Sequence, residues 1–275
     1  MPRTPRGASR PVSVGRRVAA EFLRQSRGIP LVTARREFAL PGLAAVRAAG
    51  NPRVSWVALF AKAYGLAARR HPALRRSWTT FPFSRLYEHP ASACVVLVER
   101  EVGGEETVLG GKVRAPEEMP LADIDRYVRS FQTAPVRSVS CFRQLLRVGR
   151  YPRLLLRFLM WSSLHWSGHK RSKRFGTFLI SSLGNFGCET VHPHFPLTGY
   201  LSYGPISADG RTTVSLTFDH RVLDGRQAAR ALVDIESFLN TVLVAELRNT
   251  SASRQPNPTA DGDLVTPDFE SLAAA

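Results

Sequence analysis

The segment from Ser215 to Leu232, SLTFDHRVLDGRQAARAL, constrains the fold more than any other part of the chain. A strand-like apolar run ends there in a charged cluster around His220, and Asp224 and Gly225 follow at once. Residues 226–239 then repeat apolar side chains at helical spacing. A strand end that continues directly into a helix would hold this imidazole in a fixed position, as a general base requires.

The rest of the chain alternates predicted helices and strands, which is typical of an α/β domain. Between 137 and 168 the spacing is helical but interrupted at Pro152. We expect one domain over 15–247, with a disordered basic tail over 1–14 and a disordered tail over 248–275. Helices are predicted over 16–26, 42–49, 55–71, 120–132 and 226–239, and strands over 29–40, 93–100, 106–113, 176–182, 198–207 and 212–219.

The net charge of +16 is distributed unevenly. Residues 1–17 hold five arginines and no acid, and residues 137–176 hold ten Lys or Arg and no acid. Such a field favours an anionic partner, which could be nucleic acid, a phospholipid surface or a phosphorylated cofactor, although a solvated surface has the same composition. The three cysteines have neither disulfide nor metal-ligand spacing, which fits a reducing compartment. With no signal peptide or membrane span in the pattern, we predict a cytoplasmic protein.

Four sequence blocks resemble one enzyme family. FDHRVLDG is similar to the DHRxxDG motif of the dihydrolipoamide acyltransferases, the E2 catalytic cores of the 2-oxo acid dehydrogenase complexes, and to the related HHxxxDG of chloramphenicol acetyltransferases. RRVAAEFLRQSRGIP, VSWVALFAKAYGLAARRHPAL and FLISSLGNFG resemble three other E2 blocks, in the family's order over about 15–245. The resemblance implies a chloramphenicol-acetyltransferase-like α/β two-layer sandwich with a mixed sheet, assembled as a homotrimer.

The same resemblance assigns roles to five residues. His220 matches the family's general base, and Ser181 matches the hydroxyl that stabilises the oxyanion. Asp224 would keep the site in shape by pairing with Arg16 of the first helix, and Gly225 would allow a tight turn at the strand end. In the family the histidine comes from one subunit and the serine from its neighbour. From the residues alone, a strand-end histidine and a strand serine also fit purely structural roles.

The implied reaction moves an acyl group between coenzyme A and a thiol, such as a dihydrolipoamide, or a hydroxyl acceptor. No lipoyl domain is recognisable in the sequence, so we expect a stand-alone core without covalent lipoyl. Its acyl group would come from acyl-CoA directly, or from a separate acyl carrier or lipoylated protein. A lipid or secondary-metabolite acceptor is an alternative, and residues that bind the cofactor are not assigned.

The basic and apolar segment 137–174 departs most from the family. It could be a packed helix that faces water, lie on an anionic membrane or cover an acyl tunnel, and the cluster HKRSKR, 169–174, could meet coenzyme A phosphates. A non-enzymatic trimeric scaffold that binds an anionic membrane or a partner complex, and so lies peripheral to the membrane, is therefore the rival interpretation. Nucleic acid is disfavoured because no known nucleic-acid module is present. The pairs His165/His169 and His192/His194 lack a third ligand, so no metal is predicted.

Overall fold

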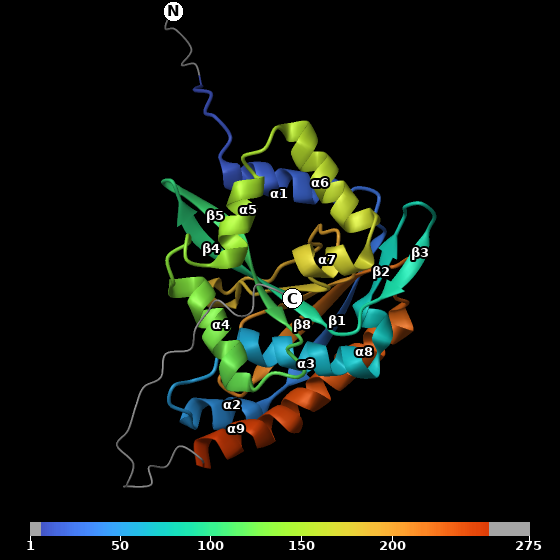
Figure 1. The fold of residues 1–275 in the computed structure, drawn as a ribbon. Coiled ribbons are helices and arrows are strands. Elements are labelled where there is room, and N and C mark those ends of the chain that lie inside the picture. The colour runs from blue at the N-terminus through green and yellow to red at the C-terminus, as the bar shows by residue number, and fades with distance from the viewer. Residues whose placement is uncertain (1–6, 253–275) are drawn as a thin grey trace, which may run out of the picture.

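A six-stranded mixed sheet runs through the middle of the molecule, with helices on both of its faces (Figure 1). The computed structural model describes residues 7–252. The strands lie in the order β1-β8-β7-β6-β4-β5, in which β4, β6 and β7 are parallel and the other neighbours are antiparallel. The predicted mixed-sheet α/β architecture is confirmed, whereas the trimer stays a prediction. The strands are β1 Leu31–Ala39, β4 Ala93–Val102, β5 Glu105–Arg114, β6 Phe178–Ser181, β7 Gly199–Tyr203 and β8 Arg211–Asp219.

The larger core lies between one sheet face and the helices drawn below it in Figure 1. Helix α3 is rich in alanine, so it approaches the sheet closely and aromatic rings fill the space between them. Tyr64 stacks on Phe178 with ring centroids 3.8 Å apart, and Phe60 stacks on Tyr203 at 4.3 Å. The helices on this side are α2 Pro41–Ala49, α3 Trp56–Arg70, α4 Leu121–Thr133, α8 Gly225–Asn240 and α9 Val242–Ala252.

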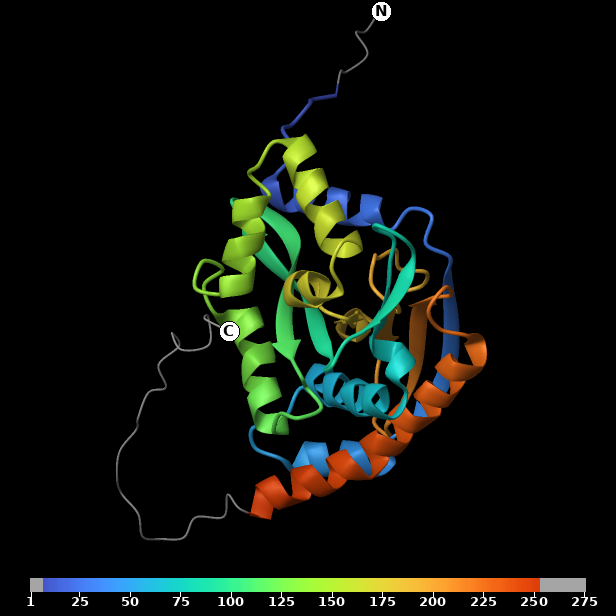
Figure 2. The same ribbon diagram turned by 45° about the vertical axis from the view of Figure 1, so that its right-hand side comes forward.

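The segment 137–174 folds into helices α5 to α7 (Figures 1 and 2). With α1, helices α6 and α7 cover the opposite sheet face, whereas α5 lies beside the edge strand β5 and its Phe142 belongs to the larger core. Leu164 packs with Leu179 and Tyr200 of the sheet, and a second small cluster joins the segment to Val18 of α1. The segment thus adds a layer that a two-layer sandwich does not have. These helices are α1 Val14–Gln25, α5 Ser140–Val148, α6 Arg153–His165 and α7 Gly168–Phe175.

A short hairpin, β2 Arg76–Thr79 and β3 Arg85–Glu88, is absent from the sequence prediction. Its strands have four residues each, too few to show a clear alternation. The Phe81 N–H donates to the His165 carbonyl oxygen at 3.2 Å, and the Phe81 ring centroid lies 5.0 Å from that of Trp166. The hairpin therefore packs on the C-terminal end of α6.

The helices extend slightly beyond both predicted limits of the domain. α1 begins at Val14, and α9 continues to Ala252, so it covers the first residues of the tail expected over 248–275. The rest of that tail and residues 1–6 of the N-terminal tail lie outside the described residues. Of the helices described, none combines the length and the apolar character that crossing a bilayer requires.

Candidate active site

His220 lies immediately after β8, where the chain leaves the sheet. Its backbone N–H donates to the carbonyl oxygen of Pro30 at 2.9 Å, which joins the strand end to the segment between α1 and β1. The imidazole is 44% exposed, and its centroid lies 5.7 Å from the Phe218 ring. A partly exposed imidazole on a fixed backbone suits a general base. The strand-end position agrees with the sequence analysis, and the catalytic role stays a prediction.

Asp219 and Arg221, which flank this histidine, form an ion pair that folds the turn. The Asp219 carboxylate accepts bonds from the Arg221 Nε at 2.9 Å and from its Nη2 at 2.7 Å. Asp219 is buried, and the guanidinium carbon lies 5.5 Å from the centre of the Trp78 ring. Bidentate pairs of this kind are strong and directional, so they fix the backbone on both sides of the imidazole. Neither residue was predicted to belong to the site, although the opposite charges on either side of His220 indicate that the two can form an ion pair.

Asp224 lies near the histidine but does not hydrogen-bond to it. Its Oδ1 is 3.8 Å from Nδ1 of His220, beyond hydrogen-bond distance, so the contact is electrostatic. The Asp224 backbone N–H donates to Oε1 of Gln227 at 3.0 Å, which caps the first turn of α8. Within this chain Gly225 has no positive φ, and a Cβ there would meet no atom within 4 Å, so no contact among the described residues requires glycine; its supporting role at the site stays a prediction.

The predicted pairing of Arg16 with Asp224 is also wrong. The Arg16 Nε instead donates to the carboxylate of Glu105 on β5. Arg16 lies in the first turn of α1, whereas Pro30, which contacts His220, follows the last turn. At 1.5 Å per residue, the helix separates its two ends by about 15 Å. A helical pattern identifies the helix but does not tell which of its ends meets the strand end.

Ser181 is the last residue of β6 and is half-buried. Burial raises the pKa of Tyr200, and hydrogen bonds to the side chains of Ser181 and Thr190 partly offset this rise. The phenol therefore stays protonated at neutral pH and can hold the Ser181 hydroxyl in place. Ser182 binds backbone: its hydroxyl donates to a carbonyl at 2.9 Å and accepts from an N–H at 3.1 Å. Tyr200 is a neighbour of the candidate site that sequence analysis missed.

Within one chain the structure does not bring Ser181 and His220 together. Ser181 lies opposite Ser202 of β7, which lies opposite Ser215 of β8. His220 is five residues farther along β8 and beyond the sheet. At about 3.4 Å per residue and about 4.8 Å between strands, the two backbones are about 20 Å apart. Ser181 is thus level with the middle of β8, whereas His220 lies beyond its end.

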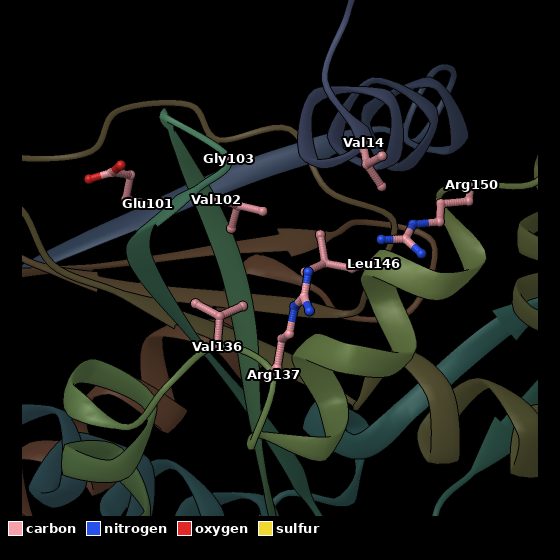
Figure 3. A pocket seen from close by; sticks show the side chains of 8 residues that line it. All are labelled: Val14, Glu101, Val102, Gly103, Val136, Arg137, Leu146 and Arg150. Carbon is pink, nitrogen blue, oxygen red and sulfur yellow. The ribbon is translucent and has the colours of Figure 1, made fainter.

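A cavity of about 240 Å³ lies between α1, the β4–β5 turn and α5 (Figure 3). Figure 3 shows the side chains of Arg137 and Arg150 extending toward one another on the α5 side, while Glu101 points away. None of the five residues predicted for the active site lines this cavity. It is therefore separate from the candidate site.

Metal ligands do not cluster in the part of the chain that the structure describes. Over residues 7–252, no group of three or more His, Cys, Asp or Glu side chains is placed to hold a metal ion. Burial lowers the pKa of His165 to about 4, which keeps that imidazole neutral.

Comparisons with known proteins identify the fold. No protein-family model matches the chain, and no curated protein matches its sequence. Among solved structures, it is similar to a dihydrolipoamide acetyltransferase of Azotobacter vinelandii, with a TM-score of 0.64, 17% identity, and 89% of this chain and 100% of that chain covered. A probable dihydrolipoamide acetyltransferase of Listeria monocytogenes gives a TM-score of 0.62, 19% identity, and 86% and 95% coverage.

A truncated catalytic core of the 2-oxoacid dehydrogenase complex of Thermoplasma acidophilum gives a TM-score of 0.59 at 16% identity, with 86% of this chain and 99% of that chain covered. The similarity therefore extends over most of this chain and nearly all of each core. The chain has the fold of the acyltransferase catalytic cores of the 2-oxo acid dehydrogenase complexes.

Proposed function

We propose that the chain is an acyltransferase that moves an acyl group between coenzyme A and a thiol or hydroxyl acceptor, in a trimer whose active sites lie between subunits. His220 of one protomer would be the general base, and Ser181 of its neighbour would stabilise the oxyanion. One observation carries the proposal: the two groups lie about 20 Å apart on one sheet. In a fold shared with acyltransferase cores, they can act together only across a subunit boundary.

The reaction follows from these two groups. The neutral imidazole of His220 takes the proton of the acceptor thiol or hydroxyl while the sulfur or oxygen attacks the thioester carbon. The carbonyl oxygen becomes an oxyanion, which accepts a hydrogen bond from the Ser181 hydroxyl. The tetrahedral intermediate then collapses, the carbon–sulfur bond to coenzyme A breaks, and the imidazolium returns its proton to the departing thiolate.

The Azotobacter acetyltransferase supports this assignment of residues. That structure concerns the role of a serine, a histidine and an asparagine in the catalytic mechanism, and its histidine and asparagine are four residues apart. His220 and Asp224 have the same spacing in this sequence, and Nδ1 of His220 lies 3.8 Å from Oδ1 of Asp224. Because the Asp224 carboxylate lies beyond hydrogen-bond distance, it would influence the orientation and charge of the imidazole by electrostatic attraction.

Replacing Ser181 with alanine should lower the rate of acyl transfer by about 10²–10³-fold, because an oxyanion donor is lost. The assay follows coenzyme A thiol release from acetyl-CoA with dihydrolipoamide, a lipoylated protein, a fatty alcohol and a simple aliphatic alcohol as acceptors, which also identifies the acceptor class. Ser202→Ala is the matched control, since that serine lies opposite Ser181 on the next strand. An equal loss in both variants would contradict a specific role for Ser181.

A second candidate function is a scaffold on an anionic membrane, and the outer face of α6 favours it. Leu154, Leu155 and Phe158 on that helix and Trp166 just after it are between 43% and 75% exposed. The segment 137–176 around them has ten Lys or Arg and no acid. An apolar stripe with basic flanks and an aromatic side chain is suited to the surface of an anionic bilayer.

Flotation with vesicles of phosphatidylcholine and phosphatidylserine tests this scaffold. The wild-type protein should float, and the double variant Leu154→Ser with Phe158→Ser should bind at least about tenfold more weakly, because two exposed apolar side chains that would enter the bilayer are lost. The double variant Val233→Ser with Val242→Ser, which changes exposed residues of α8 and α9, should float like wild type. Equal flotation of all three proteins contradicts a docking role for α6.

A further inference from the structure

A second cavity, of about 470 Å³, lies between β5 and the helices α5 and α7. Its cationic side chains come from two separate parts of the chain. Lys112 and Arg114 lie on β5, and α7 contributes Lys170, Lys173 and Arg174 together with a histidine. The remaining lining residues belong to α5 and its start, and no Asp or Glu lines the cavity. This cavity is therefore a concentrated positive site, which two elements far apart in sequence build together.

The positive charges are not neutralised within the described part of the chain. None of the five Lys and Arg residues has a carboxylate within salt-bridge distance among residues 7–252. Burial, together with the neighbouring charges of Arg114 and Lys173, lowers the pKa of Lys112 to about 8. Cations held together in this way repel one another, so an anion that entered the cavity would bind favourably.

We propose that this cavity binds the phosphate groups of a small molecule that carries two or more phosphates. Arginine and lysine are the residues that recognise phosphate oxygens, and several of them are needed for more than one phosphate group. The same chemistry could come from the nucleotide end of an acyl-CoA or from a phospholipid headgroup with two phosphates, such as that of cardiolipin. Helix α7, which supplies three of the cations, belongs to the segment 137–174, outside the four blocks that resemble the family.

The sheet register favours the nucleotide source. Lys112 lies opposite Val95, which lies opposite Leu179, and Leu179 precedes Ser181 by two residues. Alternation then places the Lys112 and Ser181 side chains on the same sheet face, with backbones about 12 Å apart. The separation is within the length of a phosphopantetheine arm anchored by its phosphates. This extension to coenzyme A rests on the proposed acyltransferase function, whereas the phosphate site itself does not.

Calorimetry with three probes tests the site: inorganic pyrophosphate, coenzyme A and dephospho-coenzyme A. All three should bind the wild-type protein, coenzyme A most tightly, and binding should weaken with added salt. The double variant Lys170→Glu with Lys173→Glu should bind each probe at least about tenfold more weakly. Arg230→Glu with Arg248→Glu makes the same change in net charge on exposed positions of α8 and α9 and should bind like wild type.

A thiol-protection measurement locates the binding. Cys141 lines the cavity, whereas Cys188 is exposed elsewhere. Bound coenzyme A or pyrophosphate should slow alkylation of Cys141, detected by mass spectrometry, and leave Cys188 unaffected. Protection of neither cysteine, or equal binding by both charge variants, overturns the proposal.

Two further arms separate this inference from the proposed function. His220→Ala should keep wild-type coenzyme A binding, because His220 does not line the cavity. If that variant loses transfer while Lys170→Glu with Lys173→Glu binds coenzyme A normally, the phosphate site is wrong and the acyltransferase stands. If vesicles that contain cardiolipin, whose headgroup carries two phosphates, protect Cys141 and coenzyme A does not, the ligand is a lipid headgroup and the coenzyme A extension is overturned.

Discussion

We expect His220→Ala to lower acyl transfer by about 10²–10⁴-fold, the range that a positioned general base contributes. The imidazole is the group that would remove the acceptor proton, and it stands 44% exposed at the end of β8. Its backbone is held by Pro30 on one side and by the buried Asp219–Arg221 ion pair on the other. The alanine variant keeps all of these bonds, because none of them uses the imidazole. The rate with saturating acetyl-CoA and acceptor measures the effect.

Two measurements distinguish a loss of catalysis from a loss of folding or assembly. The variant should have the same oligomeric state by sedimentation and the same thermal midpoint as wild type, since the substituted side chain is partly exposed. His220→Gln should be as inactive as the alanine variant, because an amide keeps the hydrogen-bonding shape but cannot accept the proton at neutral pH. A loss of activity below tenfold in His220→Ala would contradict the assignment of His220 as the general base.

Mixed oligomers of His220→Ala and Ser181→Ala subunits should recover activity that neither variant has alone. In the proposed cyclic trimer, each boundary would join His220 of one subunit to Ser181 of the next. In a cyclic trimer that contains both variants, one of the three boundaries combines a wild-type His220 with a wild-type Ser181, so about a third of wild-type activity should return after both tags have been selected. Coexpression with two different affinity tags, followed by sequential purification and the thiol-release assay, measures this recovery.

The controls for this experiment use the same two tags. Coexpressed His220→Ala subunits carrying both tags should remain inactive, which excludes recovery by contaminating enzyme. Native mass spectrometry should confirm that the mixed preparation contains both subunits in one oligomer. Mixed oligomers without any recovered activity would show that the two residues do not form a shared site.

The sequence predicted the sheet well, because its strands and neighbouring helices have regular periods. The helix predicted over 226–239 is α8, Gly225–Asn240, and the strand predicted over 212–219 matches β8, Arg211–Asp219. The β2–β3 hairpin was missed because four-residue strands carry little pattern. Helix α9 was not predicted, because it starts only two residues after α8 ends and its apolar and polar residues do not fall on clearly different faces.

Predicted contacts between residues were right within one short motif and wrong where they depend on how two distant segments pack together. His220 and Asp224 are four residues apart, so their proximity follows from the local turn. The contact of Arg16 depends on how α1 lies across the sheet, and this orientation brings it to Glu105. Tyr200 reaches Ser181 from the neighbouring strand, a contact that depends on strand register and is invisible in either segment alone.

The parallel pairing of β4 with β6 has a consequence for how this chain can change. Parallel neighbours require a crossover connection, and here the path from β5 to β6 includes α4 to α7. The register of the sheet is set by strand residues such as Cys94 and Phe178, which lie outside those helices. The crossover nevertheless supplies Phe131 of α4 and Leu164 of α6 to the two cores, so only its exposed positions can change without disturbing the strands that carry Ser181 and His220.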